Sequence, residues 1–194
     1  MKRFIGACAV MAAFSLPASA ALTAGQPAPD FDAQASLAGK AAPYSLKDAL
    51  KKGPVVVYFY PSAFTSGCNV QAHEFAVKSD KFAAAGASII GVSLDSIARL
   101  NEFSADPEYC NSKFPVASDA DGRIARSYDL SVQQGRAGQK DTRGAEIGHD
   151  FAERTTFIVS PEGKVVATVG GMSAKSNVEK ALEAVQAYAV SRGK

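Results

Sequence analysis

Two uninterrupted apolar runs are the strongest strand signals in the chain. Residues 55–60 read VVVYFY, β-branched and aromatic throughout, and residues 87–94 read ASIIGVSL. A strand that is apolar on both faces is typical of the centre of a sheet covered by helices on both sides. We therefore expect two buried central strands. The first of them ends at Pro61, because proline has no N–H to donate to a strand ladder.

Helical spacing of apolar positions predicts five helices. A short helix is expected at residues 45–50, with Ser45 as its N-cap. A longer one at residues 65–85 ends at Gly86. Its apolar positions are Val70, Phe75, Val77 and Phe82. Three further helices are expected at residues 96–109, 124–128 and 177–190, and the last of these is amphipathic.

The second half of the chain predicts a long loop followed by a β-hairpin. Residues 131–150 are polar, contain several glycines and lack periodicity, so we expect a surface loop of a length that is usually functional or mobile. A short strand is expected before it, at residues 114–116. Strands at residues 154–160 and 165–171 flank a tight turn. Alternating βα units followed by a hairpin predict one mixed α/β sheet flanked by helices.

The first 20 residues have the pattern of a cleaved signal peptide. The basic start MKR precedes an apolar run at residues 4–16, and the small residues ASA at 18–20 form a cleavage site. The run is shorter than the roughly 20 residues of a membrane span. We therefore expect cleavage after Ala20, export to the periplasm without stable membrane contact, and a single domain in residues 21–194.

Composition and charge exclude several classes of partner. The 194 residues, 47% hydrophobic and 21% charged, have the composition of a globular protein. Cleavage would remove two of the 21 basic residues and none of the 19 acidic ones, so the mature chain carries no formal net charge. Because there is also no cluster of Lys or Arg, nucleic acids and anionic membranes are poor partners. We expect small-molecule chemistry instead.

Two cysteines, Cys68 and Cys110, remain after cleavage, in a compartment where disulfides persist. The simplest interpretation is one static bridge. The position of Cys68 argues for more, because it falls in the first turn of the helix after a buried strand, where Thr65 is placed to cap that helix. Unpaired N–H groups and the positive end of the helix dipole favour a thiolate there. We therefore interpret Cys68 as a nucleophile.

The sequence around Cys68 resembles a known active-site motif. Pro61, Thr65 and Cys68 form P-x-x-x-T-x-x-C, which is similar to the motif of the peroxiredoxins. The resemblance continues through residues 24–31, 114–130 and 154–165. It implies a thioredoxin-like fold with peroxiredoxin decorations, and a thiol peroxidase that reduces hydrogen peroxide and organic hydroperoxides. It implies no metal, haem or flavin cofactor.

The resemblance also implies a role for each residue of the site. Cys68 attacks the peroxide and becomes a sulfenic acid, while the Thr65 hydroxyl and the Arg154 guanidinium hydrogen-bond the peroxide oxygens. The backbone N–H of Cys68 adds a fixed dipole, and Pro61 shields the pocket. The alternative for Arg154 is an ordinary surface charge at the start of a strand.

The sulfenic acid must be recycled by a second thiol. The chain is most similar to the bacterioferritin comigratory, or Q-type, branch, whose members often carry a second cysteine five residues after the first, but His73 occupies that position here. Cys110, at the end of the helix expected at residues 96–109, is the internal candidate, and a bridge to Cys68 requires a conformational change. The alternatives are an external thiol or an intermolecular bridge through Cys110. We expect a thioredoxin-like reductant and a monomer or homodimer.

Two other classes share the expected fold. A thiol–disulfide oxidoreductase normally needs C-x-x-C, but the sequence NVQ follows Cys68. A copper-binding chaperone would use Cys68 with His149, but its C-x-x-x-C pattern is missing because residue 72 is alanine. We expect both His73 and His149 to be structural, since their spacing matches no zinc motif.

Overall fold

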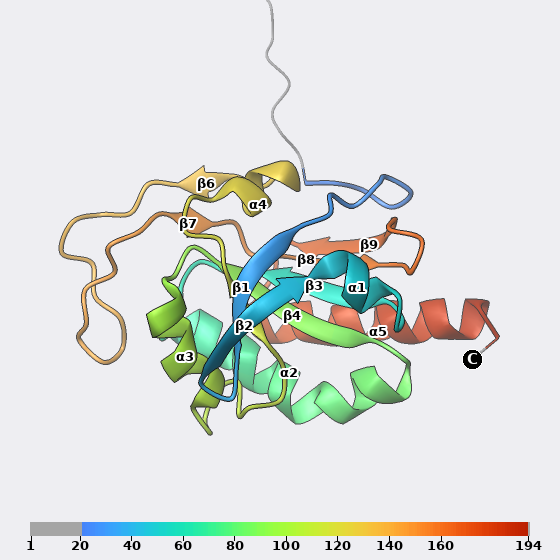
Figure 1. Cartoon of the computed structure of the whole chain (residues 1–194), viewed down its shortest axis with the longest axis horizontal. Helices are drawn as coiled ribbons and strands as arrows, with labels where there is room; N and C mark the ends of the chain where they lie inside the picture. Colours follow the sequence, from blue (N-terminus) through green and yellow to red (C-terminus); the bar gives the residue numbers. More distant parts are fainter. Residues whose placement is uncertain (1–20, 194) are drawn as a thin grey trace, which may run out of the picture.

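A seven-stranded sheet with helices on both faces forms the body of the molecule (Figure 1). The computed structural model describes residues 21–193, so the predicted signal peptide and its cleavage site lie outside the described residues. The strands are β1 (Asp32–Leu37), β2 (Lys40–Ser45), β3 (Val55–Phe59), β4 (Ser88–Ser93), β5 (Val116–Ser118), β6 (Val132–Gln133), β7 (Phe151–Ala152), β8 (Thr155–Val159) and β9 (Val165–Gly170). The helices are α1 (Leu46–Leu50), α2 (Ser66–Ala84), α3 (Ile97–Ala105), α4 (Arg123–Ser127) and α5 (Ala174–Ser191).

The sheet is mixed, as the sequence predicts. Its strand order is β2-β1-β5-β4-β3-β8-β9, in which β3, β4 and β5 run parallel to one another. β8 pairs antiparallel with β3 on one side and with β9 on the other, which confirms the predicted hairpin. The two predicted buried strands, β3 and β4, therefore lie inside the sheet, where both of their edges are paired.

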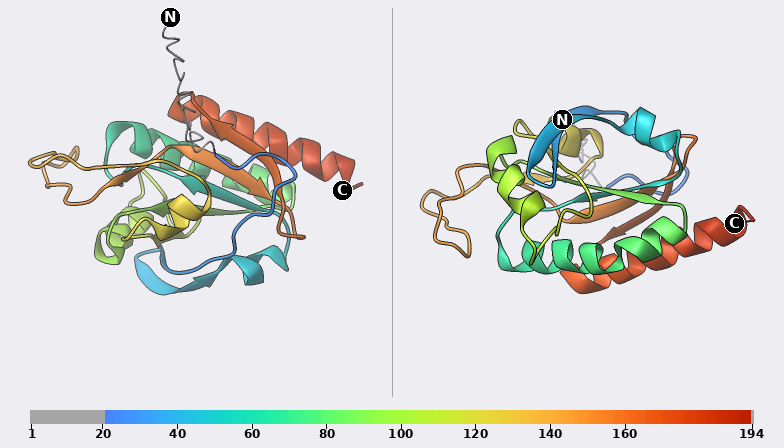
Figure 2. Two further views of the ribbon diagram at one scale, coloured as in Figure 1. Left: turned by 90° about the horizontal axis from the view of Figure 1, so that it is seen from above. Right: turned by 60° about the horizontal axis from the view of Figure 1, so that its bottom comes forward.

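Side chains of β3 alternate between two apolar cores, one on each face of the sheet. Val56 and Tyr58 point into the core formed with α2 and α5. Val55, Val57 and Phe59 point into the other core, which includes residues of α1 and α4. All five side chains are at most 1% exposed. Figure 2 shows α2 and α5 lying side by side over one face, so an uninterrupted apolar strand is what this central position requires.

The predicted apolar face of α2 is wrong at two positions. Phe75 and Phe82 are buried, but Val70 is 46% and Val77 is 65% exposed. The helix buries small alanines and the polar side chains Asn69 and Gln71 instead. The reason is close packing: α2 packs against both the sheet and the neighbouring helix α5, where small alanines and paired polar groups such as Gln71 fit.

α3 is shorter than predicted, and this changes the position of Cys110. The helix ends at Ala105 because Asp106 precedes Pro107, and a residue before proline avoids the helical conformation. Asp106 is extended, with φ −63° and ψ 122°. Cys110 therefore lies in the turn that follows α3, and not at the helix end. The next strand, β5, begins at Val116 and so starts later than expected.

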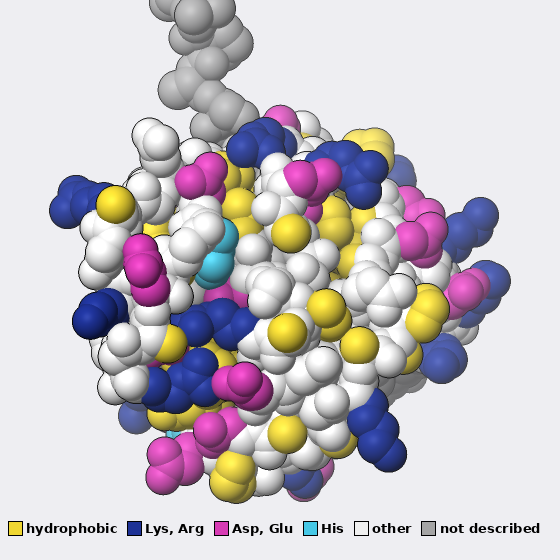
Figure 3. Space-filling view, turned by 60° about the vertical axis from the view of Figure 1, so that its left-hand side comes forward, with side chains coloured by type: hydrophobic (Ala, Val, Ile, Leu, Met, Phe, Trp, Pro, Cys, Tyr) yellow, Lys and Arg dark blue, Asp and Glu magenta, His cyan; other side chains and the backbone are white. Residues whose placement is uncertain are grey.

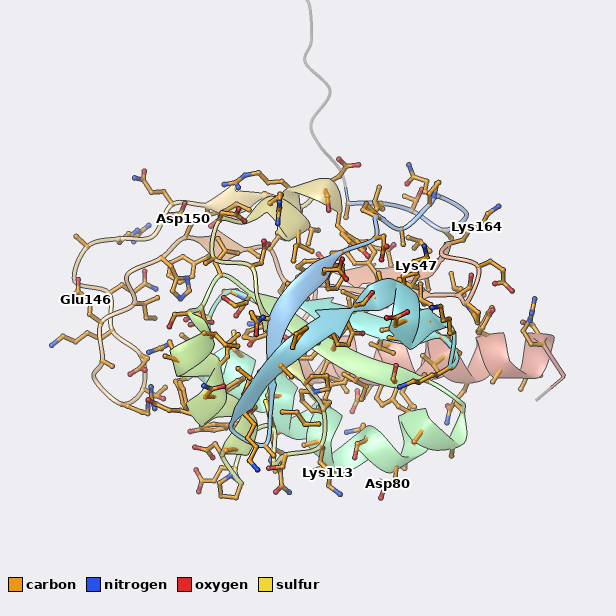
Figure 4. The ribbon with its side chains drawn as sticks, viewed as in Figure 1. Lys47, Asp80, Lys113, Glu146, Asp150 and Lys164 are labelled. Carbon is orange, nitrogen blue, oxygen red and sulfur yellow. The ribbon has the colours of Figure 1, made fainter. Side chains whose placement is uncertain are left out.

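The loop predicted at residues 131–150 protrudes from the molecule (Figure 1), and its two ends are tied by the short strands β6 and β7. Figure 4 shows Glu146 at its outer end and Asp150 nearer the body. α5 begins at Ala174, earlier than predicted, and the Ser173 side chain caps it by accepting from the N–H of Ser176. Among residues 21–193, no helix combines the length and the apolar character needed to cross a membrane.

Candidate active site

Cys68 lies in the first turn of α2, directly after the chain leaves the central strand β3. It is the third residue of the helix and only 2% exposed. Thr65 occupies the N-cap position, and its carbonyl accepts from the N–H of Asn69 at 2.8 Å. The first N–H groups of a helix have no partner within it, so the turn that contains Cys68 carries unpaired backbone donors and the positive end of the helix dipole.

The predicted side-chain cap by Thr65 is wrong. Its hydroxyl donates to the carbonyl of Ser62 at 2.8 Å and makes no capping hydrogen bond to the helix. The tight turn between β3 and α2 brings that carbonyl within reach, and the hydroxyl proton is used there. The Thr65 oxygen therefore faces the site as an acceptor. Ser45, at the start of α1, likewise makes no side-chain cap.

Arg154 lies against the thiol. Its Nη2 donates to Cys68 Sγ at 3.3 Å, although 86 positions separate the two residues in the sequence. The pairing of β3 with β8 causes this: Phe59, at the end of β3, is opposite Thr155, at the start of β8. Gly67 adds the necessary space, since a Cβ there would lie 3.1 Å from Nη2.

A buried polar chain holds the other side of the guanidinium. Arg154 Nη1 donates to Gln71 Oε1, and Gln71 Nε2 donates to Asn177 Oδ1 at 2.9 Å. Gln71 and Asn177 are both fully buried. Neither residue was predicted from the sequence. The available signal was an amide side chain on the inner face of each helix, where an apolar residue is usual.

A cleft of about 390 Å³ lies beside Arg154, the residue that contacts the thiol. Pro61, Thr65 and Arg154 line one side of it. The other wall is formed by the loop and by the strands that tie it, at Gln133, Gln139, Phe151, Ala152 and Glu153. A larger hollow of about 610 Å³ is lined by residues of β1, β2 and the α1 region, but no cysteine, histidine or arginine lines it. The smaller cleft is therefore the candidate active site.

Asp95 is hydrogen-bonded to the turn that precedes Thr65. This buried carboxylate accepts from the N–H of Ala63 at 2.8 Å and from the Ser62 hydroxyl at 3.0 Å. It also accepts from Arg99 Nε at 2.9 Å, and the same arginine donates through Nη2 to the carbonyl of Ala63. His149 Nε2, from the protruding loop, lies 2.8 Å from its Oδ1. The sequence predicted a structural His149, whereas no role was predicted for Asp95.

The pKa values of Asp95 and His149 move apart. Burial opposes ionisation of Asp95, but hydrogen bonds from His149, Ala63 and Ser93 outweigh it and hold the pKa of the carboxyl below its ordinary range. Burial also opposes protonation of His149, but the hydrogen bond to Asp95 and its charge outweigh this and raise the imidazole pKa, against a smaller opposing effect of Arg99. Each group therefore favours the charged form of the other, so the pair is stabilised as an ion pair.

The loop also clamps Phe64, the residue before Thr65. The N–H and the hydroxyl of Thr142 both donate to the carbonyl of Phe64, at 2.9 and 2.8 Å. The Arg143 guanidinium lies 3.3 Å from the centre of the Phe64 ring. On this side of the molecule, Figure 3 shows basic side chains gathered between a histidine and several acidic side chains. Phe64 has a φ of 58°, a left-handed conformation that costs a side-chain-bearing residue about 1–2 kcal/mol.

Cys110 is fully buried and its thiol is free, as is that of Cys68. Both belong to the same apolar core. Burial raises the pKa of the Cys110 thiol well above its ordinary value, and the charge of Asp106 adds to the effect. His73, exposed on α2, hydrogen-bonds the carbonyl of Glu108 at 2.9 Å and so ties the Cys110 turn to that helix.

The geometry gives no support to a copper site at Cys68 and His149. His149 Nδ1 lies 2.7 Å from the carbonyl of Asp150, and Nε2 faces Asp95, so both ring nitrogens are engaged. Among residues 21–193, no three His, Cys, Asp or Glu side chains are grouped as metal ligands.

Comparison with known proteins identifies relatives over most of the chain. A sequence model of the AhpC/TSA family matches residues 24–168. The chain is 33% identical over 135 residues to peroxiredoxin Bcp of Xanthomonas campestris, covering 70% of this chain and 78% of that protein. It is 31% identical over 164 residues to a putative peroxiredoxin bcp of Helicobacter pylori, covering 84% and 98%.

Solved structures agree with these relatives. The fold is similar to that of peroxidoxin BcpB from Mycobacterium tuberculosis, with a TM-score of 0.70, 29% identity, and coverage of 86% of this chain and 97% of that one. It is also similar to the bacterioferritin comigratory protein of Xanthomonas campestris, with a TM-score of 0.63, 31% identity, and coverage of 80% and 91%. The predicted thioredoxin-like fold, as peroxiredoxins have it, is confirmed.

The ion pair of Asp95 and His149 predicts how stability depends on pH. Because the His149 pKa is raised on folding, its contribution is fully present below about 6.5, the ordinary histidine value, and is lost as pH rises through the higher folded-state value. His149→Gln should therefore lower the free energy of unfolding at about pH 6 by about 1.5–3 kcal/mol, the range for hydrogen bonds to charged groups, and by less at about pH 9. Urea unfolding measures this difference.

The lower limit of this pH window comes from Asp95. Its depressed pKa makes its contribution present above the unfolded carboxyl value and lost as pH falls through the folded one. His73→Gln is the control for loss of an imidazole, because His73 hydrogen-bonds a backbone carbonyl and should not reproduce the trend. A stability difference for His149→Gln that stays constant across the range would contradict the ion pair.

Proposed function

The chain belongs to the AhpC/TSA family and is a thiol peroxidase of the peroxiredoxin type, and on this basis we propose that Cys68 is its peroxidatic nucleophile. The observation that carries the proposal is the 3.3 Å contact between Arg154 Nη2 and Cys68 Sγ in the first turn of a helix. A guanidinium and a set of backbone donors there stabilise a thiolate, and a thiolate is the reactive form of cysteine.

The proposed step oxidises sulfur and reduces the peroxide. Cys68 Sγ attacks one peroxide oxygen, and an S–O bond forms as the O–O bond breaks. The electron pair of the O–O bond leaves with the second oxygen, which takes up a proton and departs as water or an alcohol. Cys68 is left as a sulfenic acid. Negative charge develops on the departing oxygen, so Arg154 and the helix N–H groups lower the barrier.

Thr65 has a defined part in this step. Its hydroxyl proton is committed to the Ser62 carbonyl, so its oxygen can accept a hydrogen bond from the O–H of a hydroperoxide. Arg154 is a donor only and can bind the peroxide oxygens. The pair can therefore bind both the O–H donor and the acceptor oxygens of a hydroperoxide. Pro61 covers the edge of the cleft and limits the access of water.

The cleft supports hydrogen peroxide and small organic hydroperoxides as substrates. A volume of about 390 Å³ is larger than hydrogen peroxide requires. Pro61, Phe151 and Ala152 offer apolar surface for an alkyl group, and Gln133 and Gln139 offer polar groups. Alkyl peroxide reduction activity is described for the similar bacterioferritin comigratory protein of Xanthomonas campestris.

We propose that Cys110 resolves the sulfenic acid within the same chain. Its thiolate would attack the Cys68 sulfur, form the disulfide and release water, and a thioredoxin-like thiol would then reduce the bridge. Because Cys110 is fully buried and its thiol is held protonated, this step requires local opening of the turn after α3 and of the first turn of α2. An external thiol and a bridge between two chains remain the competing routes.

Export to the periplasm is a further part of the proposal. It is supported by the basic start, the apolar run at residues 4–16 and the small residues at 18–20.

Replacing Arg154 should slow peroxide reduction far more than it destabilises the fold. Arg154→Ala is expected to lower the second-order rate constant with hydrogen peroxide by about 10²–10³-fold, the usual effect of losing one donor to a developing oxyanion. Arg154→Lys keeps the charge but loses the planar fork of donors. Its rate constant should therefore lie between those of the wild type and of the alanine variant. Stopped-flow kinetics measures the rates, and circular dichroism checks folding. Unchanged kinetics in the alanine variant would remove Arg154 from the site.

One equivalent of hydrogen peroxide should link the two cysteines of the reduced mature protein. Peptide mass spectrometry is expected to show the loss of two hydrogens and a bond between Cys68 and Cys110 in a monomeric product. Cys68→Ser should abolish fast peroxide consumption, while Cys110→Ser should accumulate sulfenic acid on Cys68. Full turnover by Cys110→Ser with a thioredoxin-like donor would assign resolution to an external thiol, and a covalent dimer would assign it to a second chain.

Full-length chain expressed in a bacterium with a periplasm should be recovered there with Ala21 as its first residue. Intact mass spectrometry of the periplasmic and cytoplasmic fractions tests this. Ala20→Glu, which removes a small residue from the cleavage site, should accumulate the uncleaved precursor. Recovery of the wild-type chain in the cytoplasm with residues 1–20 retained would contradict export.

A further inference from the structure

A chain of buried hydrogen bonds runs from the hairpin strand β9 to the guanidinium of Arg154. Asn177, in the first turn of α5, donates through Nδ2 to the carbonyl of Val169 at 2.9 Å. Its Oδ1 accepts from Gln71 Nε2 at 2.9 Å and from the Thr156 hydroxyl at 2.6 Å. Gln71 Oε1 then accepts from Arg154 Nη1. Gln71, Thr156 and Asn177 are all 0% exposed.

The two ends of this chain allow only one orientation of both amides. The carbonyl of Val169 can only accept, so Asn177 must turn its NH₂ toward it and its oxygen toward Gln71. Arg154 can only donate, so Gln71 must turn its oxygen toward the guanidinium and its NH₂ toward Asn177. If either amide were flipped, donors would face donors at one link and acceptors would face acceptors at the other. The backbone of β9 thus determines which atom of Gln71 meets Arg154.

The strand pairing aligns the parts of this chain. Thr156 of β8 is directly opposite Val169 of β9, so the two hairpin partners of Asn177 lie at one cross-strand position. Asn177 reaches them because α5 begins immediately after β9 and packs against the hairpin. Arg154 precedes Thr156 by two residues. The same hairpin therefore carries Arg154 and fixes the residue that orients its partner.

We propose that Asn177 is a positioning residue for peroxide reduction, acting on Arg154 through Gln71. The inference rests on the proposed function, because it concerns the arginine that serves the Cys68 site. Held by Gln71 at Nη1, the guanidinium directs Nη2 at the Cys68 sulfur. Without Asn177, the buried NH₂ group of Gln71 loses its acceptor, and Gln71 turns toward another partner because an unpaired buried donor is costly. Arg154 then loses its fixed angle beside the thiol.

The test compares two reactions of the same thiol in wild-type protein and in Asn177→Leu. Stopped-flow kinetics gives the rate constant with hydrogen peroxide, and peptide mass spectrometry gives the rate of alkylation of Cys68 by iodoacetamide, a reaction with no oxygen leaving group. We expect the ratio of the peroxide rate to the alkylation rate to fall by about 10- to 100-fold in Asn177→Leu, as for other misplaced catalytic groups. An unchanged ratio would overturn the proposal.

Controls separate positioning from loss of stability. Ser104→Ala removes a buried 2.8 Å hydrogen bond to Ser36, between α3 and β1, and should lower the melting temperature without changing the ratio. Asn177→Asp should restore most of the ratio at mildly acidic pH, because burial keeps the acid neutral and a carboxylic acid can both donate to Val169 and accept from Gln71. A ratio as low as that of the leucine variant would contradict the role.

A double-mutant cycle tests the route through Gln71. In a Gln71→Met background, Asn177→Leu should change the ratio by less than about twofold, because its route is already broken. If Asn177→Leu does not fold, the rate ratios of Gln71→Met and Asn177→Asp still test the positioning role. An equal further loss in the Gln71→Met background would overturn the route. Wild-type protein that alkylates readily but reacts slowly with peroxide would contradict the proposed function itself. Wild-type protein that reacts rapidly with peroxide, together with an unchanged rate ratio in Asn177→Leu, would contradict only the positioning role of Asn177.

Discussion

The hydrogen bond between Arg154 and Cys68 depends on the register in which β8 pairs with β3. Phe59 opposite Thr155 brings the end of one strand beside the start of the other, and both active residues lie just beyond that edge. A slip of one position would turn every side chain of β8 to the opposite face of the sheet. Because β8 is buried on both faces, such a slip would move Phe157 and Val159 into the core now filled by Ile158 and the reverse, and the close packing of the two cores therefore protects the geometry of the site.

Two sets of polar side chains support the site from two sides, and each set is hydrogen-bonded to backbone groups. On the side of the helices, Gln71 and Asn177 connect Arg154 to the carbonyl of Val169. On the side of the loop, Asp95 binds the N–H of Ala63, and Arg99 binds the carbonyl of the same residue. Buried polar networks stabilise a structure only when their members are satisfied, and these two are largely satisfied by protein groups. They explain why polar residues occupy positions where the apolar pattern alone predicts hydrophobic ones.

The packing that prepares Cys68 also restrains its proposed partner. Both thiols lie in one apolar core, and the left-handed Phe64 that precedes the active helix is held there by Thr142 and Arg143 of the loop. In the proposed cycle, the folded conformation that reacts with peroxide and the opened conformation that forms the disulfide are therefore two different conformations of the same chain. Strain at Phe64 favours opening, while the clamp opposes it. In the proposed cycle, the balance between this strain and the clamp would set how long a sulfenic acid on Cys68 stays within the folded site.

Local patterns in the sequence determined the central strands, the hairpin and the position of Cys68 at the start of a helix. Each of these follows from residues that are neighbours in the chain: apolar runs, a turn between two strands, and a proline just after a strand. The motif of Pro61, Thr65 and Cys68 was readable for the same reason, and the resemblance it carries named Arg154.

Only the tertiary structure decided which face of α2 is buried, where α3 ends before Cys110, and which groups hold Arg154 and the turn that precedes Thr65. Gln71 meets Asn177 across 106 positions, and Asp95 meets His149 across 54. Contacts of that separation arise from strand order and helix packing. No periodicity within a single segment encodes them, because a local pattern reports which side chains share a face and not what lies opposite that face.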